Sequence, residues 1–401
     1  RVALLTERPG GDGEYRCALE SQKSVARAAA GIARDLGRVR AVIHLPRLPG
    51  EHAPDALDPR AWRAILSRDV KGAFHVVRQF QADLVASAGG GALLAATTWL
   101  GGTLGLPVET AAAPELAEAP PRPSDGGVSG FFKALAHELM PLRVKVVDLE
   151  PPSTAAEAET AASLFLEEIE SGGSRIETGR RGSRRFVPRV APSPVTPVAP
   201  GRDLDPSRPI LLFGGGRGIT AAIARDLARH FRPTLVLFGT TVLPDDVEAK
   251  ASLDDGGLKE LRKRIAAEIR DAGGRATPVE IQARMQPIVR AIEIHRTLRD
   301  LNAAGARAFY RACDVRDADA VRKAVNGAVR EHGPLHGVVF GAGTIEDALL
   351  EKKTPESFDR VFGVKAEGIF NVARAVGTHA PDFFVAFSSV AGRFGNAGQA
   401  D

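Results

Sequence analysis

The sequence predicts an α/β fold made of two parallel-sheet units, and three observations support this. Short aliphatic runs alternate with helical stretches along most of the 401 residues, as they do in βαβ units. A proline-rich stretch over 188–209 interrupts the alternation near the middle of the chain. The strand-like run 210–213 leads directly into glycines at the start of a helix-like segment. We therefore expect a structural unit over 1–190, a linker over 191–209 and a ligand-binding unit over 210–401.

The second half of the chain predicts strands and helices in a regular order. After the strand over 210–213 we expect a helix over 220–230 and a strand over 235–238. A long charged stretch from about 255 to 303 has leucine and isoleucine at three-to-four spacing, which indicates a helical insertion. The remaining elements are a strand over 306–315, a helix over 321–331, a strand over 335–340, a mostly helical stretch over 358–376 and a strand over 383–387.

The first half repeats this order weakly, which indicates an internal duplication. Three pairs of segments match, namely 40–46 with 336–340, 69–74 with 365–370, and 93–98 with 384–389. In the second pair the glycines align.

Composition excludes several classes of protein. No run approaches the roughly 20 apolar residues of a membrane-spanning helix, so we expect no membrane partner. Net charge is +4 and aromatic residues make up 5%, whereas a nucleic-acid-binding protein typically has a dense basic surface interleaved with aromatics. Cys17 and Cys313 form no CxxC pair and no HExxH motif is present. We therefore expect no metal site, and a reducing, cytoplasmic location.

One basic cluster lies beside the proline-rich stretch. We expect it to be a solvated strand or linker edge, and docking of an acidic partner is the alternative. Its members are Arg175, Arg180, Arg181, Arg184, Arg185 and Arg189.

The glycine-rich run GGGRGI over 214–219 is the motif that carries chemistry. Gly214 and Gly218 lack the Cβ atoms that would keep a backbone away from a pyrophosphate, and a helix N-terminus offers N–H groups to it. Such turns also occur without a ligand. The second strand is followed by Thr240 rather than an acid that would hold a ribose 2′-hydroxyl, and Arg217 stands where it could meet a 2′-phosphate. This combination favours NADP over NAD.

These residues resemble the cofactor loop of short-chain dehydrogenases/reductases. More narrowly, they resemble the ketoreductase domain of type I polyketide and polyunsaturated fatty acid synthases. The resemblance covers nearly the whole chain, and 177–190 is similar to the strand that leads out of the structural half of that family. It implies two Rossmann-like parallel-sheet subdomains, of which the first is degenerate and the second binds the cofactor.

The resemblance also implies roles for individual residues. Lys365 stands where these ketoreductases keep their catalytic lysine, and Ser389 lies in a run similar to the catalytic serine strand. The first half has Asp69 and Thr97-Thr98 instead, so we expect it to be catalytically inert. The residues implied to bind the cofactor are Gly214, Gly215, Gly216, Arg217, Gly218, Ile219, Thr240, Asp314, Val315, Gly341, Ala342 and Gly343.

Each of these positions also has a structural interpretation. On spacing alone, Lys365 is an ordinary surface lysine, Ser389 a strand-end residue and Asp314 a turn cap. The family usually has an arginine where this chain has Thr240, so the preference for NADP rests mainly on Arg217.

The family places its catalytic tyrosine thirteen residues after the serine, at position 402, and an asparagine at 406. Neither Tyr15 nor Tyr310 can substitute for that tyrosine by sequence. Hydride reduction of a ketone leaves an alkoxide that needs a proton donor. We therefore expect these residues alone to bind cofactor with little or no turnover. Because the sequence begins at Arg1 and ends before position 402, we also expect it to be cut from something longer.

The leading hypothesis is an NADPH-dependent reductase of β-ketoacyl thioesters on acyl carrier protein, beside neighbouring domains of a multidomain synthase. The alternatives are a free-standing reductase of small ketones and a non-catalytic pseudo-reductase scaffold. The run Ile-Glu-Asp over 345–347 resembles a Leu-Asp-Asp motif of one stereochemical type, with Asp347 kept. Phe394 stands where the opposite type has tryptophan. The resemblance therefore implies a D-3-hydroxyacyl product.

Overall fold

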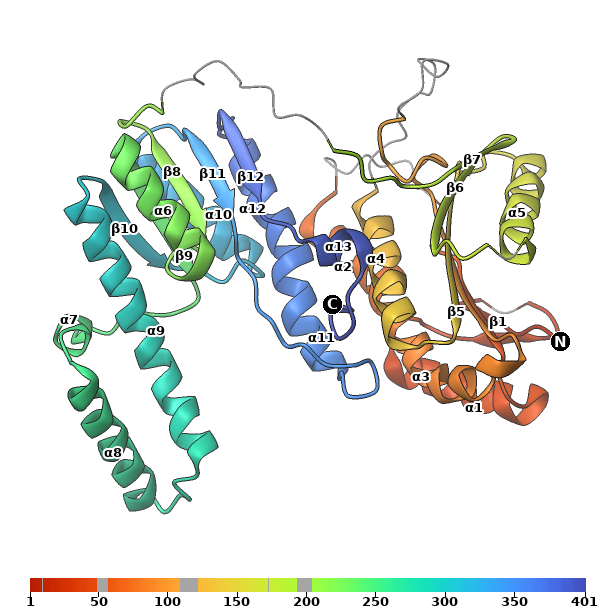
Figure 1. Ribbon diagram of the computed structural model, residues 1–401, viewed down its shortest axis with the longest axis horizontal. Helices are drawn as coiled ribbons and strands as arrows, with labels where there is room; N and C mark the ends of the chain where they lie inside the picture. The colour runs from red at the N-terminus through yellow and green to blue at the C-terminus, as the bar shows by residue number, and fades with distance from the viewer. Residues whose placement is uncertain (9, 49–56, 109–121, 172, 193–203) are drawn as a thin grey trace. The chain divides into compact units, whose positions relative to one another are not determined.

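The computed structural model describes the chain in two compact units (Figure 1). Unit 1 contains 1–195 together with 345–359 and 388–401, and unit 2 contains 196–344 and 360–387. Two segments from the second half of the sequence therefore belong to unit 1. The described residues are all except 9, 49–56, 109–121, 172 and 193–203.

Most of the predicted linker over 191–209 lies outside the described residues. Its last residue, Pro209, begins the first strand of unit 2. Among the described residues, no helix has the length and apolar character needed to cross a bilayer.

Unit 2 is built around a parallel five-stranded sheet, as the sequence predicts. Its strand order is β10-β9-β8-β11-β12. Numbered along the chain, this order is 3-2-1-4-5, so the direction of winding reverses between β8 and β11. Ligands of doubly wound sheets bind at that point, beyond the carboxyl ends of the strands. The strands are β8 (Pro209–Phe213), β9 (Thr234–Gly239), β10 (Arg307–Ala312), β11 (Gly337–Phe340) and β12 (Phe383–Ala386).

Helices cover both faces of this sheet, which explains why β8 is apolar at every position. Leu211 and Phe213 face a core shared with α10 (Ala318–His332) and α12 (Gly368–Gly377). The alternate residues Ile210 and Leu212 face a second core, shared with α6 (Gly218–Phe231). Alternation of side chains along a strand therefore fills two cores from one run.

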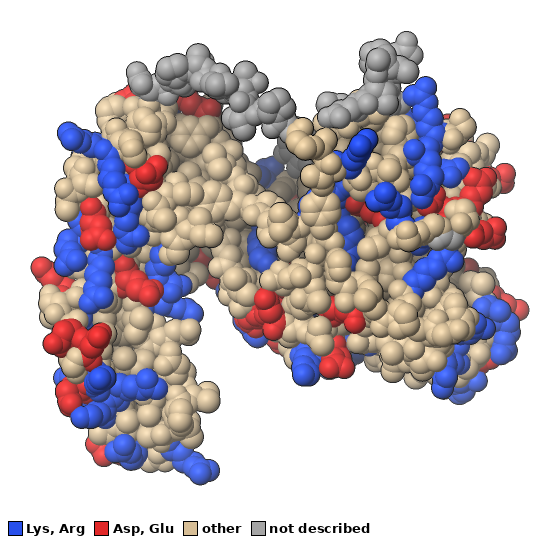
Figure 2. All heavy atoms as spheres, viewed as in Figure 1, with Lys and Arg blue, Asp and Glu red and all other residues tan. Residues whose placement is uncertain are grey.

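Three helices lie between β9 and β10, in the stretch assigned to a helical insertion. They are α7 (Val247–Ala251), α8 (Asp255–Asp271) and α9 (Pro278–Ala303). The Thr277 side chain caps α9 by accepting a hydrogen bond from the Glu280 backbone N–H. Helices α8 and α9 share a small core around Ile265 and Met285. On the face shown in Figure 2, positive and negative side chains are intermixed over this region.

Unit 1 contains a five-stranded sheet of order β3-β4-β5-β6-β7. The first four strands are parallel and β7 is antiparallel to β6. The segment expected as one strand over 177–190 is a hairpin, because Gly182 adopts φ +53° at its turn. The strands are β3 (Ala41–His44), β4 (Leu93–Thr98), β5 (Arg143–Leu149), β6 (Glu177–Arg181) and β7 (Arg184–Phe186).

Further elements complete unit 1. A short parallel pair forms near the N-terminus, and helices pack on the larger sheet or on one another. These elements are β1 (Leu4–Thr6), β2 (Glu14–Arg16), α1 (Gln22–Leu36), α2 (Pro59–Leu66), α3 (Gly72–Ala86), α4 (Pro123–Glu138), α5 (Ala155–Glu170) and α13 (Val390–Phe394), with a 3₁₀ turn η3 at Ala88–Gly90.

The structure supports the predicted duplication through an uncommon feature. The helix before β4 is interrupted by a π-helical turn, η2 (Ser67–Lys71), between α2 and α3. The helix before β12 is interrupted in the same way by η4 (Gly363–Glu367), between α11 (Pro355–Phe362) and α12. Single π-turns are rare and often mark functional sites. Asp69 and Lys365 each occupy the third position of their turn.

Half of the basic cluster is neutralised within unit 1. Arg180 pairs with Glu167 and Arg181 with Glu150, at 2.8 Å and 2.9 Å. Arg185 donates two hydrogen bonds to the fully buried Glu168 carboxylate, and these bonds lower the pKa of Glu168. These three arginines therefore have structural partners inside the unit.

Helix α4 holds the two segments that join unit 1 from later in the sequence. The two carboxylate oxygens of Glu138 accept hydrogen bonds from the backbone N–H groups of Leu350 and Gly398, both at 2.8 Å. Arg393 donates to Glu177 at 2.6 Å. A single helix of the first half thus fixes the positions of loops that are 212 and 260 residues away in sequence.

Candidate functional site

The glycine-rich loop of unit 2 lies at the carboxyl end of the central strand β8. Gly214 adopts φ +82°, and a Cβ atom there would lie 2.7 Å from the Gly341 carbonyl oxygen. The Gly341 N–H donates to the Phe213 carbonyl at 2.9 Å. Only glycine permits this approach, which brings the loop against the end of β11. The runs over 214–219 and 341–343 therefore meet at the switch point of the sheet.

The outer side of the loop is open, as a cofactor cradle requires. Gly218 adopts φ +62°, and a Cβ atom at Gly218 or Gly343 would meet nothing within 4 Å. Ile219 is 75% exposed although it is apolar. The first turn of α6 is not capped by the side chain of its N-cap residue, Arg217. Backbone N–H groups at the positive end of a 14-residue helix fit a pyrophosphate.

Two further predicted contacts lie at the same edge of the sheet. The exposed Thr240 follows β9 directly. The Arg217 guanidinium is half exposed and forms an ion pair with Glu293 at 3.1 Å. Tyr310 on β10 donates its hydroxyl hydrogen bond to the Thr241 carbonyl at 2.8 Å, and burial raises the pKa of Tyr310 to about 12.

Asp314 and Val315 follow β10. The Asp314 carboxylate accepts hydrogen bonds from the backbone N–H of Arg316 at 3.0 Å and from its guanidinium at 2.7 Å. These bonds lower the pKa of Asp314. The carboxylate therefore does cap a local turn, which was the structural interpretation of this residue. Val315 is buried, and its carbonyl accepts from the Asn371 side chain at 2.9 Å.

The two predicted catalytic residues are described in different units. Lys365 is exposed on the π-turn η4 of unit 2. Ser389 belongs to unit 1, where it is exposed and caps α13 by accepting from the Ala391 N–H at 3.1 Å. This contact matches the structural interpretation of a strand-end serine. No cluster of three metal-ligating side chains occurs among the described residues.

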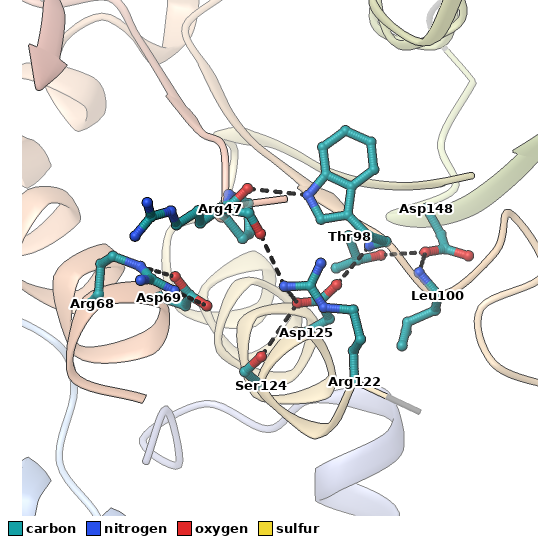
Figure 3. Close-up of polar contacts among 11 residues, drawn as sticks. Arg47, Arg68, Asp69, Thr98, Leu100, Arg122, Ser124, Asp125 and Asp148 are labelled. Carbon is teal, nitrogen blue, oxygen red and sulfur yellow. Dashed lines mark hydrogen bonds and ion pairs between the residues drawn. The ribbon is translucent and has the colours of Figure 1, made fainter. Parts of the chain in front are cut away.

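The corresponding edge of unit 1 carries buried acids in place of a glycine cradle (Figure 3). The Asp148 carboxylate accepts hydrogen bonds from the Thr98 hydroxyl at 2.8 Å and from the backbone N–H groups of Leu100 and Leu104 at 2.6 and 2.8 Å. Burial raises the pKa of Asp148 to about 6. Asp125 accepts from the neighbouring backbone of the same loop, and burial raises its pKa as well.

The residues that replace serine and lysine in unit 1 are engaged in structural contacts. Thr98 is tied to Asp148, and the buried Asp69 accepts two hydrogen bonds from Arg68, at 2.8 and 3.2 Å. These contacts support the prediction that the first half is catalytically inert, which stays a prediction. Asp125 and Asp148 were not predicted from the sequence. A lone acid in the aliphatic run 143–149 was the available signal for Asp148.

The second half of the chain matches the family model of the KR domain over residues 209–401. Among curated relatives, a polyunsaturated fatty acid synthase polypeptide of Thraustochytrium sp. is 29% identical over 252 residues. That alignment covers 61% of this chain and 9% of the relative. The highly-reducing polyketide synthase 1 of Aureobasidium melanogenum is 42% identical over 103 residues, which cover 26% of this chain and 5% of the relative. The chain thus spans less than a tenth of either relative.

Solved structures show the same fold. An N-terminal ketoreductase from the macrolactin assembly line superposes with a TM-score of 0.67 at 19% identity. The superposition covers 99% of this chain and 66% of that one. A ketoreductase domain from the bacillaene assembly line gives a TM-score of 0.61 at 20% identity, over 91% of this chain and 73% of the other. Residues 209–401 therefore match the KR domain model, and the chain is similar to parts of polyketide and polyunsaturated fatty acid synthases.

Proposed function

We propose that the chain is the ketoreductase part of a multidomain synthase. In this proposal it reduces the β-ketone of an acyl thioester held on acyl carrier protein, with NADPH as the cofactor, to the 3-hydroxyacyl product. The observation that carries the proposal is the open glycine loop at the switch point of the unit 2 sheet, with Arg217 at its rim.

The residues of this loop fit NADPH in chemical terms. The backbone of Gly218 and Ile219 and the first turn of α6 would hold the pyrophosphate. Arg217 would pair with the 2′-phosphate, because a guanidinium offers several N–H donors to phosphate oxygens. When bound, the nicotinamide supplies a hydride.

Lys365 and Ser389 would serve the substrate carbonyl. A serine hydroxyl orients a ketone by donating a hydrogen bond to its oxygen. A lysine ammonium lowers the pKa of a neighbouring proton donor by stabilising its charged form. Reduction is complete only when a donor delivers a proton to the oxygen.

The hydroxyl groups of both tyrosines in the 401-residue sequence donate hydrogen bonds to other groups. The Tyr15 hydroxyl donates to Asp35 at 2.9 Å, and the Tyr310 hydroxyl donates to the Thr241 carbonyl. With a pKa of about 12, Tyr310 is a poor proton donor at neutral pH. We therefore propose that a polypeptide of these 401 residues binds NADPH with little or no turnover.

The proposal also covers stereochemistry, location and neighbours. A D-configured product is proposed from the resemblance of 345–347, where Asp347 accepts a hydrogen bond from the Gln399 side chain at 2.9 Å. A cytoplasmic location is proposed because Cys17 and Cys313 are free thiols. Neighbouring synthase domains are proposed from the multidomain relatives.

A fluorescence titration of the 401-residue polypeptide with NADPH and NADH tests the cofactor. We expect tighter binding of NADPH. Arg217→Ala should weaken NADPH binding about tenfold or more, since a charge-assisted contact to phosphate is lost, and should leave NADH binding unchanged. Arg225→Ala, on the same helix, is the matched control and should change neither. Equal affinities for the two cofactors, or no binding, would contradict the assignment and favour the scaffold alternative.

A further inference from the structure

The inserted helix α9 forms two ion pairs, one with Arg217 of the glycine loop and one with Arg225 of α6, the helix that begins at that loop. Arg217 pairs with Glu293 at 3.1 Å, and Arg225 pairs with Asp300 at 3.3 Å. The pairs lie about two helical turns apart. All four side chains are one-third to one-half exposed. Exposed ion pairs of this kind contribute about 0–1 kcal/mol to stability, so neither pair is needed to fold the unit.

Only the first pair touches the cofactor loop. Arg217 precedes α6 inside the glycine-rich run, whereas Arg225 lies within the helix. The residue after Glu293, Ile294, packs against the loop so closely that a Cβ atom at Gly216 would lie 2.7 Å from its Cγ1 atom. Because Ile294 is buried there, the backbone of α9 is held beside the loop. Glu293 is therefore held within reach of the Arg217 guanidinium.

A 2′-phosphate bound by Arg217 would meet this carboxylate. A phosphate monoester carries a charge of about −1.5 to −2 at neutral pH and repels a carboxylate nearby. The carboxylate also occupies one nitrogen of the guanidinium, Nη1, that the phosphate would use. Both effects lower the affinity for a cofactor that has a 2′-phosphate, and neither changes the affinity for a cofactor that lacks it.

We propose that Glu293 sets the affinity for the 2′-phosphate by competing with it for Arg217. The inserted helix thereby acts as a specificity-determining element of the cofactor site, which rests on the proposed NADPH function. The carboxylate keeps binding weak enough for exchange. Since most affinity differences between related complexes lie in the dissociation rate, Glu293 shortens the residence time of the phosphorylated cofactor.

The test compares Glu293→Gln with Asp300→Asn in the 401-residue polypeptide. The second variant removes one charge from the same helix and breaks the equivalent ion pair two turns away. The probes are NADPH, NADH and adenosine 2′,5′-bisphosphate, which carries the 2′-phosphate without the nicotinamide. Dissociation constants come from fluorescence for the reduced cofactors and from calorimetry for the bisphosphate.

We expect Glu293→Gln to bind NADPH and the bisphosphate about three- to tenfold more tightly, with NADH unchanged. Asp300→Asn should alter none of the three. The gain should shrink in high salt, which screens exposed charges. It should also be lost in the Arg217→Ala background, because the two residues then no longer interact.

Weaker NADPH binding by Glu293→Gln would overturn the inference, since the carboxylate would then be orienting Arg217. Unchanged binding, or an equal gain in Asp300→Asn, would overturn it as well. These results are distinguishable from failure of the proposed function. If wild type does not prefer NADPH and Arg217→Ala has no effect, the cofactor assignment fails. If both hold and Glu293→Gln is silent, only the role of Glu293 fails.

Discussion

Units 1 and 2 carry the same repeat of strand, interrupted helix and strand, yet the carboxyl edges of their sheets differ. In unit 2 the edge is lined by glycines, and Gly218 and Gly343 border open space. In unit 1 the edge is filled by the carboxylates of Asp69, Asp125 and Asp148, which accept hydrogen bonds from their own chain. The backbone N–H groups of Trp99, Leu100 and Leu104 at this edge are therefore already engaged by the acids. The comparison shows how one repeat can yield both an edge that is bonded internally and an edge that borders open space.

Substitution of either of two glycines with positive φ is expected to lower the free energy of unfolding most. Gly102 in unit 1 has φ +75°, and a Cβ atom there would overlap the Arg180 carbonyl oxygen. Gly214 in unit 2 is similarly tight. Alanine at either position should lower the free energy of unfolding by about 4 kcal/mol or more. Below its unfolding temperature, Gly102→Ala should still bind NADPH, whereas Gly214→Ala should not. NADPH fluorescence together with thermal unfolding measures both.

A milder variant covers the case in which Gly214→Ala does not fold. Gly218→Ala has room for its methyl group, so its backbone strain at φ +62° should cost only about 1 kcal/mol. The methyl group would nevertheless stand in the cradle. Undiminished NADPH binding by a folded Gly218→Ala protein would contradict the assignment of this cradle.

Asp148 of unit 1 and Asp314 of unit 2 should change the stability of the protein with pH in opposite directions. Burial raises the pKa of Asp148 from 3.8 to about 6, so the folded state binds more protons than the unfolded state between these values. Stability from this group is therefore present at low pH and lost as pH rises through about 6. The shift corresponds to about 3 kcal/mol.

Comparison with Asp148→Asn isolates this contribution. The stability of wild type relative to the variant should fall between pH 4 and 7, as measured by urea unfolding at each pH. Asp314 in unit 2 is the control, because Arg316 lowers its pKa. Wild type relative to Asp314→Asn should therefore gain stability as pH rises through the acidic range. A flat difference for Asp148→Asn would contradict the role of burial.

The last comparison concerns the third residue of each π-turn. Asp69 is 1% exposed and pairs with Arg68, so Asp69→Asn should cost about 2 kcal/mol, moderated by the partial exposure of Arg68. Lys365 is exposed, so Lys365→Gln should change stability by less than about 1 kcal/mol. Denaturant unfolding measures the free energy of unfolding of both variants. Equal decreases for the two variants would mean that the two π-turns have the same structural role.

Local patterns predicted the parts of this molecule that depend on neighbouring residues. The aliphatic run 210–213 becomes a strand because both its faces are covered, and the glycines after it form the expected turn. The alignment of 69–74 with 365–370 places Asp69 opposite Lys365, and the π-turns place them in the same way. The π-turns themselves were not predicted, because this backbone hydrogen-bond pattern requires no particular residue type in the sequence.

The features that were missed arise from contacts distant in sequence. Glu293 lies 76 residues from Arg217, and no periodicity links the two. Asp148 is buried because a loop 44 to 50 residues earlier folds over it. The grouping of 345–359 and 388–401 with unit 1 likewise depends on α4. Sequence reasoning from local patterns has no access to such pairings.

The two hydrogen bonds that Glu138 accepts limit where this region can be separated from the sequence before it. A polypeptide that starts at the family boundary, residue 209, contains Leu350, Gly398 and Arg393 but lacks the carboxylates that accept their hydrogen bonds. Those donors would form hydrogen bonds with water instead, and the two loops would no longer be held by the same helix. Recombination that exchanges the region 209–401 with that of a related polypeptide would therefore keep both hydrogen bonds of Glu138 only if the crossover lies upstream of α4.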